Sequence, residues 1–166
     1  KVVRINALPR YDSTIFYHHI YIPSVTYPLQ STFFTEKELD LIQSVANRSL
    51  TQSCGYNGRT PFIILYGPSE YGGAGFINLY DAQGRLQIQM FIKHWRTPSD
   101  ISTLLRICLH WWQFVAGIST PILEATQLKL PHLDEESKLM SSMRHYLGSI
   151  NAQMEVDDPG VPPSST

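Results

Sequence analysis

Two neighbouring segments organise the predicted fold. They are Tyr56-Asn57-Gly58-Arg59-Thr60-Pro61 and the glycine-rich run Gly67-Pro68-Ser69-Glu70-Tyr71-Gly72-Gly73-Ala74-Gly75-Phe76. Glycine allows backbone conformations and close approaches that other residues do not tolerate. We therefore predict that Gly72, Gly73 and Gly75 let neighbouring helices pack closely around this run.

A glycine-rich loop can also cradle phosphate when it follows a strand and opens a helix. No Lys-Ser or Lys-Thr pair follows Gly75, and the glycine spacing matches neither a dinucleotide fingerprint nor a P-loop. Close packing of the backbone is therefore the favoured interpretation, and a nucleotide site is the alternative.

Helix signals lie on both sides of this run. Thr35-Glu36-Lys37-Glu38 is a capping box, which predicts a helix that begins there and breaks at Cys54-Gly55. The apolar run Phe62-Ile63-Ile64-Leu65-Tyr66 fits either a strand or a buried helical turn. Pro23 is expected to end an N-terminal helix and to leave residues 22–29 extended.

Apolar periodicity predicts the remaining helices. They are expected over residues 10–21, over residues 77–95, over residues 100–116 with Gly117 as the C-terminal cap, and from Asp134-Glu135-Glu136 to Gly148. The expected fold is all-α, with about five helices packed around the glycine-rich loop and room for one short strand pair.

The helix expected over residues 100–116 carries two adjacent tryptophans, Trp111 and Trp112. Two such rings can stack nucleic-acid bases, but their place in an apolar stripe favours the core. The stripe comprises Ile101, Leu104, Leu105, Cys108, Trp111, Trp112 and Val115. The polar face opposite is expected to be solvated.

The chain has 166 residues and a net charge of −1, which fits one helical domain over residues 1–150 and a tail over residues 151–166. The tail is first acidic and then rich in proline and serine. Residues 1–110 carry ten basic and seven acidic residues, whereas residues 111–166 carry three and seven. A mildly basic body permits contact with phosphate without requiring it.

Neither a disulfide framework nor a four-cysteine zinc site is expected, because the chain has only two cysteines. Cys54 and Cys108 are predicted to be free, buried thiols. His18-His19 is a weak metal candidate because adjacent residues point to different sides of a helix. No apolar run is long enough to span a membrane.

A family resemblance rests on four motifs in order: Ile22-Pro23-Ser24-Val25-Thr26-Tyr27-Pro28-Leu29, Asn57-Gly58-Arg59-Thr60-Pro61, Tyr66-Gly67-Pro68 and Tyr71-Gly72-Gly73-Ala74-Gly75-Phe76. Their order resembles the region after the palm in non-LTR (LINE-like) retrotransposon reverse transcriptases. The likeness continues through Lys93-His94-Trp95-Arg96-Thr97-Pro98 and covers residues 10–160. Ala74 departs from the family, which has leucine there.

The resemblance implies a thumb or post-palm fragment of an RNA-directed DNA polymerase. A thumb grips the template–primer duplex through contacts to the backbone, without reading sequence. By this resemblance the contacts would come from Arg59, Lys93, Arg96 and Arg106. A solvated patch that complements the dipole at the end of a helix is the simpler interpretation of Lys93 and Arg96.

The resemblance further implies that this segment contacts the rest of the polyprotein and does not bind a membrane. It implies an intracellular location, with the nucleus as one option. No cofactor is expected in this segment, and Mg²⁺ is expected in the palm of the parent polymerase. The alternatives are a helical protein-interaction module, recognisable by an exposed apolar patch without a basic face, and a decayed, inactive fragment of the element.

No catalytic residue is expected in this segment. A polymerase palm needs carboxylates that hold two metal ions, and the only Asp-Asp pair is Asp157-Asp158. Pro159 and Pro162-Pro163 follow it, and prolines cannot form the returning strand of a buried hairpin.

Overall fold

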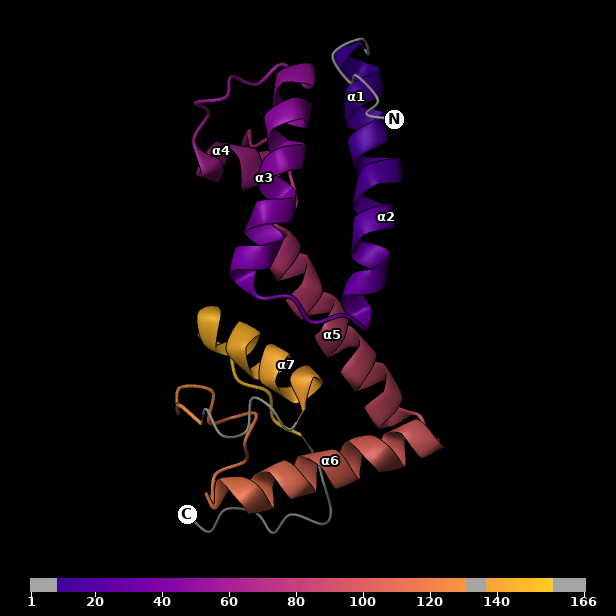
Figure 1. Cartoon of the computed structure of the whole chain (residues 1–166), viewed down its shortest axis with the longest axis vertical. Helices are drawn as coiled ribbons and strands as arrows, with labels where there is room; N and C mark the ends of the chain where they lie inside the picture. The colour runs from indigo at the N-terminus through magenta and orange to yellow at the C-terminus, as the bar shows by residue number, and fades with distance from the viewer. Residues whose placement is uncertain (1–8, 131–136, 157–166) are drawn as a thin grey trace. The chain divides into compact units, whose positions relative to one another are not determined.

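The computed structural model describes residues 9–130 and 137–156, and these residues form helices and loops without any strand (Figure 1). The all-α prediction is confirmed at this level, and no strand pair occurs within these ranges. The chain divides into two compact units, unit 1 (Lys1–Gln83) and unit 2 (Gly84–Thr166). The single domain expected over residues 1–150 stays a prediction.

Unit 1 begins with a helical rod that runs from Arg10 to Gln30. It joins α1 (Arg10–Phe16), a π-helical turn (Tyr17–Tyr21), α2 (Ile22–Thr26) and a 3₁₀ turn (Tyr27–Gln30), and Figure 1 shows α1 and α2 as one continuous rod.

The expected break at Pro23 is therefore wrong. A proline removes one backbone hydrogen bond and crowds the preceding turn of a regular α-helix. The π turn directly before Pro23 relieves this crowding, because it widens the helix by one residue. The Ile22 N–H donates to the Tyr17 carbonyl five residues earlier. Extra residues of this kind occur where a helix must accommodate such a disruption.

The second long helix of unit 1 is α3 (Glu36–Ser53), which begins at the predicted capping box. The Thr35 hydroxyl accepts the Glu38 N–H at 3.4 Å, and the Glu38 carboxylate accepts the Thr35 N–H at 2.8 Å. The Glu38 carboxylate accepts bonds from the Thr35 N–H and from the Thr35 hydroxyl, and these two bonds hold the pKa of Glu38 below its ordinary value. Leu39, Gln43 and Leu50 of this helix are buried, whereas Ile42 is exposed.

Short elements precede the glycine-rich loop. The run Phe62–Tyr66 is helical (α4), which settles the choice between strand and helix, and a 3₁₀ turn follows at Ser69–Tyr71. The loop then folds back over α4. The Ala74 N–H donates to the Ile64 carbonyl at 2.7 Å, and the Phe76 N–H donates to the Leu65 carbonyl at 2.9 Å.

The predicted role of the three glycines is wrong, because they bring the loop against itself rather than helices against one another. A Cβ on Gly73 would overlap with the backbone of Gly67, within the same loop. Gly72 and Gly75 adopt positive φ angles of 81° and 69°, which side chains disfavour, and neither is crowded by a neighbouring helix. That the whole chain packs around this loop stays a prediction, since the loop belongs to unit 1.

Buried polar side chains fix the end of the loop in unit 1. Gln43 donates to the Ile77 carbonyl at 2.6 Å and accepts the Leu79 N–H at 3.0 Å. The Tyr17 hydroxyl accepts the Ile77 N–H at 2.9 Å, and the Tyr17 ring lies 4.4 Å from the ring of Phe76. Burial raises the pKa of Tyr17 to about 12.

Helix α5 (Leu79–Arg96) begins in unit 1 and continues into unit 2. Its first turn is held within unit 1 by Gln83, whose amide bonds both the N–H and the carbonyl of Phe34 at 3.1 and 2.9 Å.

Unit 2 contains the rest of α5, α6 (Asp100–Ala116) and α7 (Lys138–Ser149). Its core consists of large apolar side chains that are almost fully buried. They are Phe91, Leu109, Trp112, Ile122, Leu123, Met140 and Met143.

Two contacts bring α7 close to its neighbours in unit 2. A Cβ on Gly84 would overlap with the ring of Tyr146, so the glycine that brings two helices together is Gly84 of α5. Arg144 is buried and donates to the carbonyls of Ala125 and Leu128, and it thereby fixes the loop before residue 131.

The termini of the unit 2 helices agree in part with the sequence. Ser99 caps α6, and Gly117 ends it with a φ of 63°, as predicted. Ser137 caps α7 through the Met140 N–H, whereas the expected start at Asp134-Glu135-Glu136 lies outside the described residues. Of the predicted tail, residues 151–156 are described. Met154 and Val156 pack against the core of unit 2, and the Met154 N–H donates to the Leu123 carbonyl at 3.2 Å.

The buried face of α6 differs from the predicted stripe. Ser102, Leu109 and Trp112 are buried. Most of the predicted stripe is exposed, namely Ile101, Leu104, Cys108 and Trp111. The choice failed because α6 carries apolar residues around most of its circumference, so that apolar periodicity does not single out one face.

Candidate nucleic-acid interface

The basic residues predicted in unit 2 lie around the turn from α5 to α6. Lys93 and Arg96 belong to the last turn of α5, and Arg106 belongs to the second turn of α6. The Thr97 hydroxyl donates to the Lys93 carbonyl at 2.9 Å and helps to end α5. Ser99 then starts α6 only three residues after Arg96, so the chain reverses sharply at this point.

Trp95 is the centre of this turn. Its carbonyl accepts bonds from the Ser102 hydroxyl at 3.4 Å and from the Arg106 guanidinium at 3.5 Å. The Arg106 guanidinium lies over the Trp95 ring, 4.2 Å from its centre, in a cation–π contact. Phe91 stacks with the same ring at 5.3 Å. Arg106 is therefore held in one orientation by a rigid aromatic pair.

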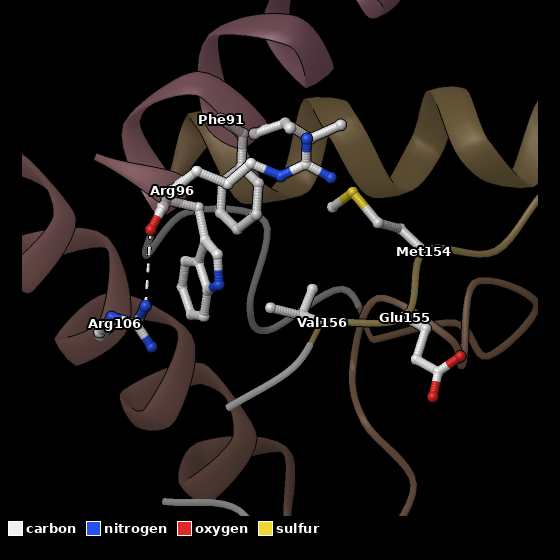
Figure 2. A pocket seen from close by; sticks show the side chains of 8 residues that line it. Phe91, Arg96, Arg106, Met154, Glu155 and Val156 are labelled. Atoms are coloured by element: carbon white, nitrogen blue, oxygen red, sulfur yellow. Dashed lines mark hydrogen bonds between the residues drawn. The ribbon is translucent and has the colours of Figure 1, made fainter. Parts of the chain in front are cut away.

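A cavity of about 620 Å³ opens beside Trp95 (Figure 2). Its lining combines both arginines of the turn with apolar side chains and one acid. The lining residues are Phe91, Ile92, Trp95, Arg96, Arg106, Met154, Glu155 and Val156.

The lining of this cavity carries two guanidinium groups and one carboxylate. Figure 2 shows the Glu155 carboxylate pointing away from both Arg96 and Arg106. A cavity with two guanidinium groups on an apolar wall suits an anionic group, since guanidinium forms charge-assisted bonds with phosphate or carboxylate.

The four predicted contact residues are only partly brought together. Arg96 and Arg106 line the same cavity. Lys93 is exposed one helical turn before Arg96, so it lies on a neighbouring part of the surface, outside the lining. Arg59 is exposed on the loop after α3, in unit 1, and belongs to a different part of the chain.

Sequence reasoning missed two features of this site. The contact between Arg106 and Trp95 joins residues eleven positions apart, across a turn, so no helical spacing indicates it. Residues 154–156 were predicted to be part of a tail, yet they supply one wall of the cavity.

The remaining candidates differ in where the structure places them. In the glycine-rich loop, the N–H groups of residues 72–76 all donate to backbone carbonyls of the loop or of α4, which favours packing over a phosphate cradle. Trp112 is buried in the core as predicted, whereas Trp111 is half exposed and the core prediction is wrong for it. Cys54 is free and buried as expected, but Cys108 is free and exposed.

Residues 9–130 and 137–156 contain neither a cluster of metal-ligating side chains nor a helix that could span a membrane. Over these ranges, no group of three or more His, Cys, Asp or Glu side chains is placed to hold a metal ion. No helix in the described part of the chain combines the length and apolar character needed to cross a bilayer. The weak carboxylate candidate Asp157-Asp158 lies outside the described residues.

Comparison of the chain with known protein families, with curated proteins and with solved structures finds no match. The resemblance to retroelement reverse transcriptases stays a prediction.

Proposed function

We propose that this chain is a non-catalytic, helical fragment of a retroelement reverse transcriptase that grips the template–primer duplex through the α5–α6 turn. The observation that carries the proposal is the pair Arg96 and Arg106, which line one cavity while Trp95 holds Arg106 in place. Two guanidinium groups on one wall can bind phosphates of a backbone without reading its sequence.

In this proposal Lys93 adds a third charge beside Arg96, and Arg59 makes a separate contact from unit 1. The catalytic carboxylates and their Mg²⁺ belong to the palm of the parent polymerase, and this segment holds no cofactor. In the same proposal the segment contacts the rest of the polyprotein and does not bind a membrane. Its location is intracellular, with the nucleus as one option.

The test is binding of an RNA–DNA hybrid duplex, followed by fluorescence anisotropy over a range of salt concentrations. Arg96→Gln is expected to weaken binding and to lower the slope of log K against log salt by roughly 0.9 for the lost phosphate contact. Lys138→Gln is the matched control, because it removes one exposed charge at the start of α7.

Arg106→Lys separates charge from geometry, since lysine keeps the charge but loses the planar guanidinium that stacks on Trp95. We expect Arg106→Lys to weaken binding almost as much as Arg106→Gln. Arg59→Gln tests the contact from unit 1 by the same measurement. Affinity that does not change with salt, or an equal loss in Lys138→Gln, would contradict the proposal.

A second candidate is a helical protein-interaction module. One observation favours it: α6 exposes large apolar side chains, including Leu104 and Phe114. Exposed apolar patches of this kind mark surfaces that bind another protein. This function does not exclude the first, because the apolar side chains and Arg106 lie on different sides of α6.

A further inference from the structure

The exposed side of α6 carries an ordered apolar seam. Its side chains are Leu104, Ile107, Trp111 and Phe114, with exposed fractions of 60%, 58%, 53% and 77%. We call these four residues the α6 seam. The opposite side of the helix is buried in the core of unit 2 through Leu109 and Trp112. α6 thus packs on one side and presents a second apolar side outward.

The spacing of the seam indicates what kind of surface would cover it. Its members follow one another at three, four and three residues, which is the spacing of the core positions in a coiled coil. Side chains at this spacing form a straight stripe along a helix and interlock with the side chains of a second helix. A partner helix that lies along α6 therefore fits the seam better than a globular or irregular partner.

The order of the side chains makes the seam complementary to itself. Two aliphatic residues, Leu104 and Ile107, are followed by two aromatic ones, Trp111 and Phe114. Residue 109 is the midpoint of the seam along the helix axis. If two copies of α6 lie antiparallel and their two-fold axis passes at this level, Leu104 of one copy meets Phe114 of the second. Ile107 likewise meets Trp111, so each of the four layers contains one aliphatic and one aromatic side chain.

A parallel pair would not have this property. It would stack like on like, with thin layers at the aliphatic end of the helix and thick layers at the aromatic end. Even layers of large against small side chains pack at native density, whereas uneven layers leave voids or overlaps.

The charges on α6 favour the same arrangement. The seam continues at its N-terminal end to Asp100, four residues before Leu104. In a parallel pair the two Asp100 carboxylates would face each other. In the antiparallel pair they lie at opposite ends of a 17-residue helix, about 25 Å apart and well beyond the screening length of about 10 Å.

The positions beside the seam add no repulsion to this pairing. The positions that flank it carry no acidic residue, no lysine and no arginine; from residue 101 to residue 110 they are Ile101, Thr103, Cys108 and His110. A helix from an unrelated protein would need matching charges at these positions to be selected. The flanking positions of α6 offer no charge that would select such a helix, and pairing with a second α6 requires no charge there.

We propose that the chain forms a homodimer in which the α6 seams of two copies pack antiparallel. The dimer is independent of the proposed grip on a duplex, because it uses the seam and leaves the cavity at Arg96 unchanged. Each function can then be removed separately.

The first test is the concentration dependence of the mass, measured by sedimentation equilibrium on the full chain. The wild type is expected to approach twice the 18.9 kDa of one chain. Trp111→Ala is expected to weaken the dimer at least about thirty-fold, since buried tryptophans at helix interfaces are hot spots. Leu41→Ala is the matched control, because Leu41 is an exposed apolar residue of α3 outside the seam.

The second test establishes the orientation of the helices. Leu104→Glu and Phe114→Lys are each expected to break the dimer. The double variant on one chain is expected to restore it, because Glu at 104 then meets Lys at 114 of the second copy in an antiparallel pair. In a parallel pair like charges would meet, and the double variant would stay monomeric.

Circular dichroism confirms that each variant keeps its helices. A wild type that stays monomeric at its highest soluble concentration would overturn the proposal. A dimer that Trp111→Ala leaves intact would overturn it as well, and so would a double variant that does not recover. Arg96→Gln is expected to keep the dimer, so failure of duplex binding and failure of pairing are distinguishable.

Discussion

The end of the glycine-rich loop in unit 1 is fixed by buried polar side chains, whereas the core cluster of unit 2 consists of large apolar ones. In unit 1, Gln43 and Tyr17 bond the backbone around Ile77, and Gln83 bonds the backbone of Phe34. In unit 2, Trp112 and Phe91 lie in a core of seven buried apolar residues. Directional bonds specify one backbone path, and apolar burial supplies stability without direction.

This difference matters for how each unit responds to change. An apolar core loses stability in proportion to the volume removed. A polar anchor fails when one partner is lost, because the remaining buried groups are left without a bond. The aromatic residues offer separate probes: all three tryptophans lie in unit 2, and eight of the nine tyrosines lie in unit 1.

The largest effect is expected from the core of unit 2. Trp112→Ala removes an almost fully buried indole and should cost about 3–5 kcal/mol of unfolding free energy. Urea unfolding followed by the fluorescence of the remaining tryptophans measures this loss. The adjacent Trp111→Ala is the control, measured at a concentration where the chain is monomeric, and a change within about 0.5 kcal/mol is expected. Equal losses in both variants would contradict the assignment of the buried face.

A smaller effect is expected from the polar anchor of unit 1. Gln43→Leu keeps the volume but leaves the Ile77 carbonyl and the Leu79 N–H without their bonds, at a cost of about 2–4 kcal/mol. The tyrosine absorbance should report this loss while the tryptophan signal changes less. Gln52→Leu, on the exposed side of α3, serves as the control. If Gln43→Leu were neutral, the loop would depend on apolar contacts as unit 2 does.

The smallest effect is a pH dependence confined to unit 1. The pKa of Tyr17 is raised from 10.0 to about 12 by burial, so the folded state holds a proton that the unfolded chain has released. The contribution of protonated Tyr17 to the unfolding free energy is fully present below pH 10 and is lost as the pH rises towards 12. Burial also raises the pKa values of Tyr21 and Tyr66, so absorbance of tyrosinate should show a late-titrating component that falls by one tyrosine in Tyr17→Phe. The component should be unchanged in Tyr71→Phe, where the ring is exposed. A late-titrating component of unchanged size in Tyr17→Phe would refute the assignment.

Local signals predicted the start of α3 and the end of α6 correctly, although the one at Pro23 failed. The capping box at Thr35 and the glycine at 117 fix their helix ends through contacts within a few residues of the chain. Such short-range chemistry is visible in a sequence because both partners lie close together in it.

Long-range choices were not predicted. α6 is apolar around most of its circumference, so only the packing of α5, α7 and the loop after Gly117 decides that Trp112 is buried and Trp111 is not. The arginines of the candidate site were predicted, but the contact of Arg106 with Trp95 and the wall at residues 154–156 depend on tertiary structure.

The π turn ahead of Pro23 has a consequence for how the N-terminal rod is read. It holds one residue more than a regular turn, which shifts the register by about 100° around the helix axis. The inward-facing positions of the rod are therefore 13, 17, 22 and 29. Tyr17 and Ile22 are spaced five positions apart, where a regular helix would space them three or four. A related chain with one residue fewer in this turn and no proline at position 23 would bury the same side of the rod with a regular α-helix. In an alignment of such chains, a single-residue gap therefore belongs within Tyr17–Tyr21.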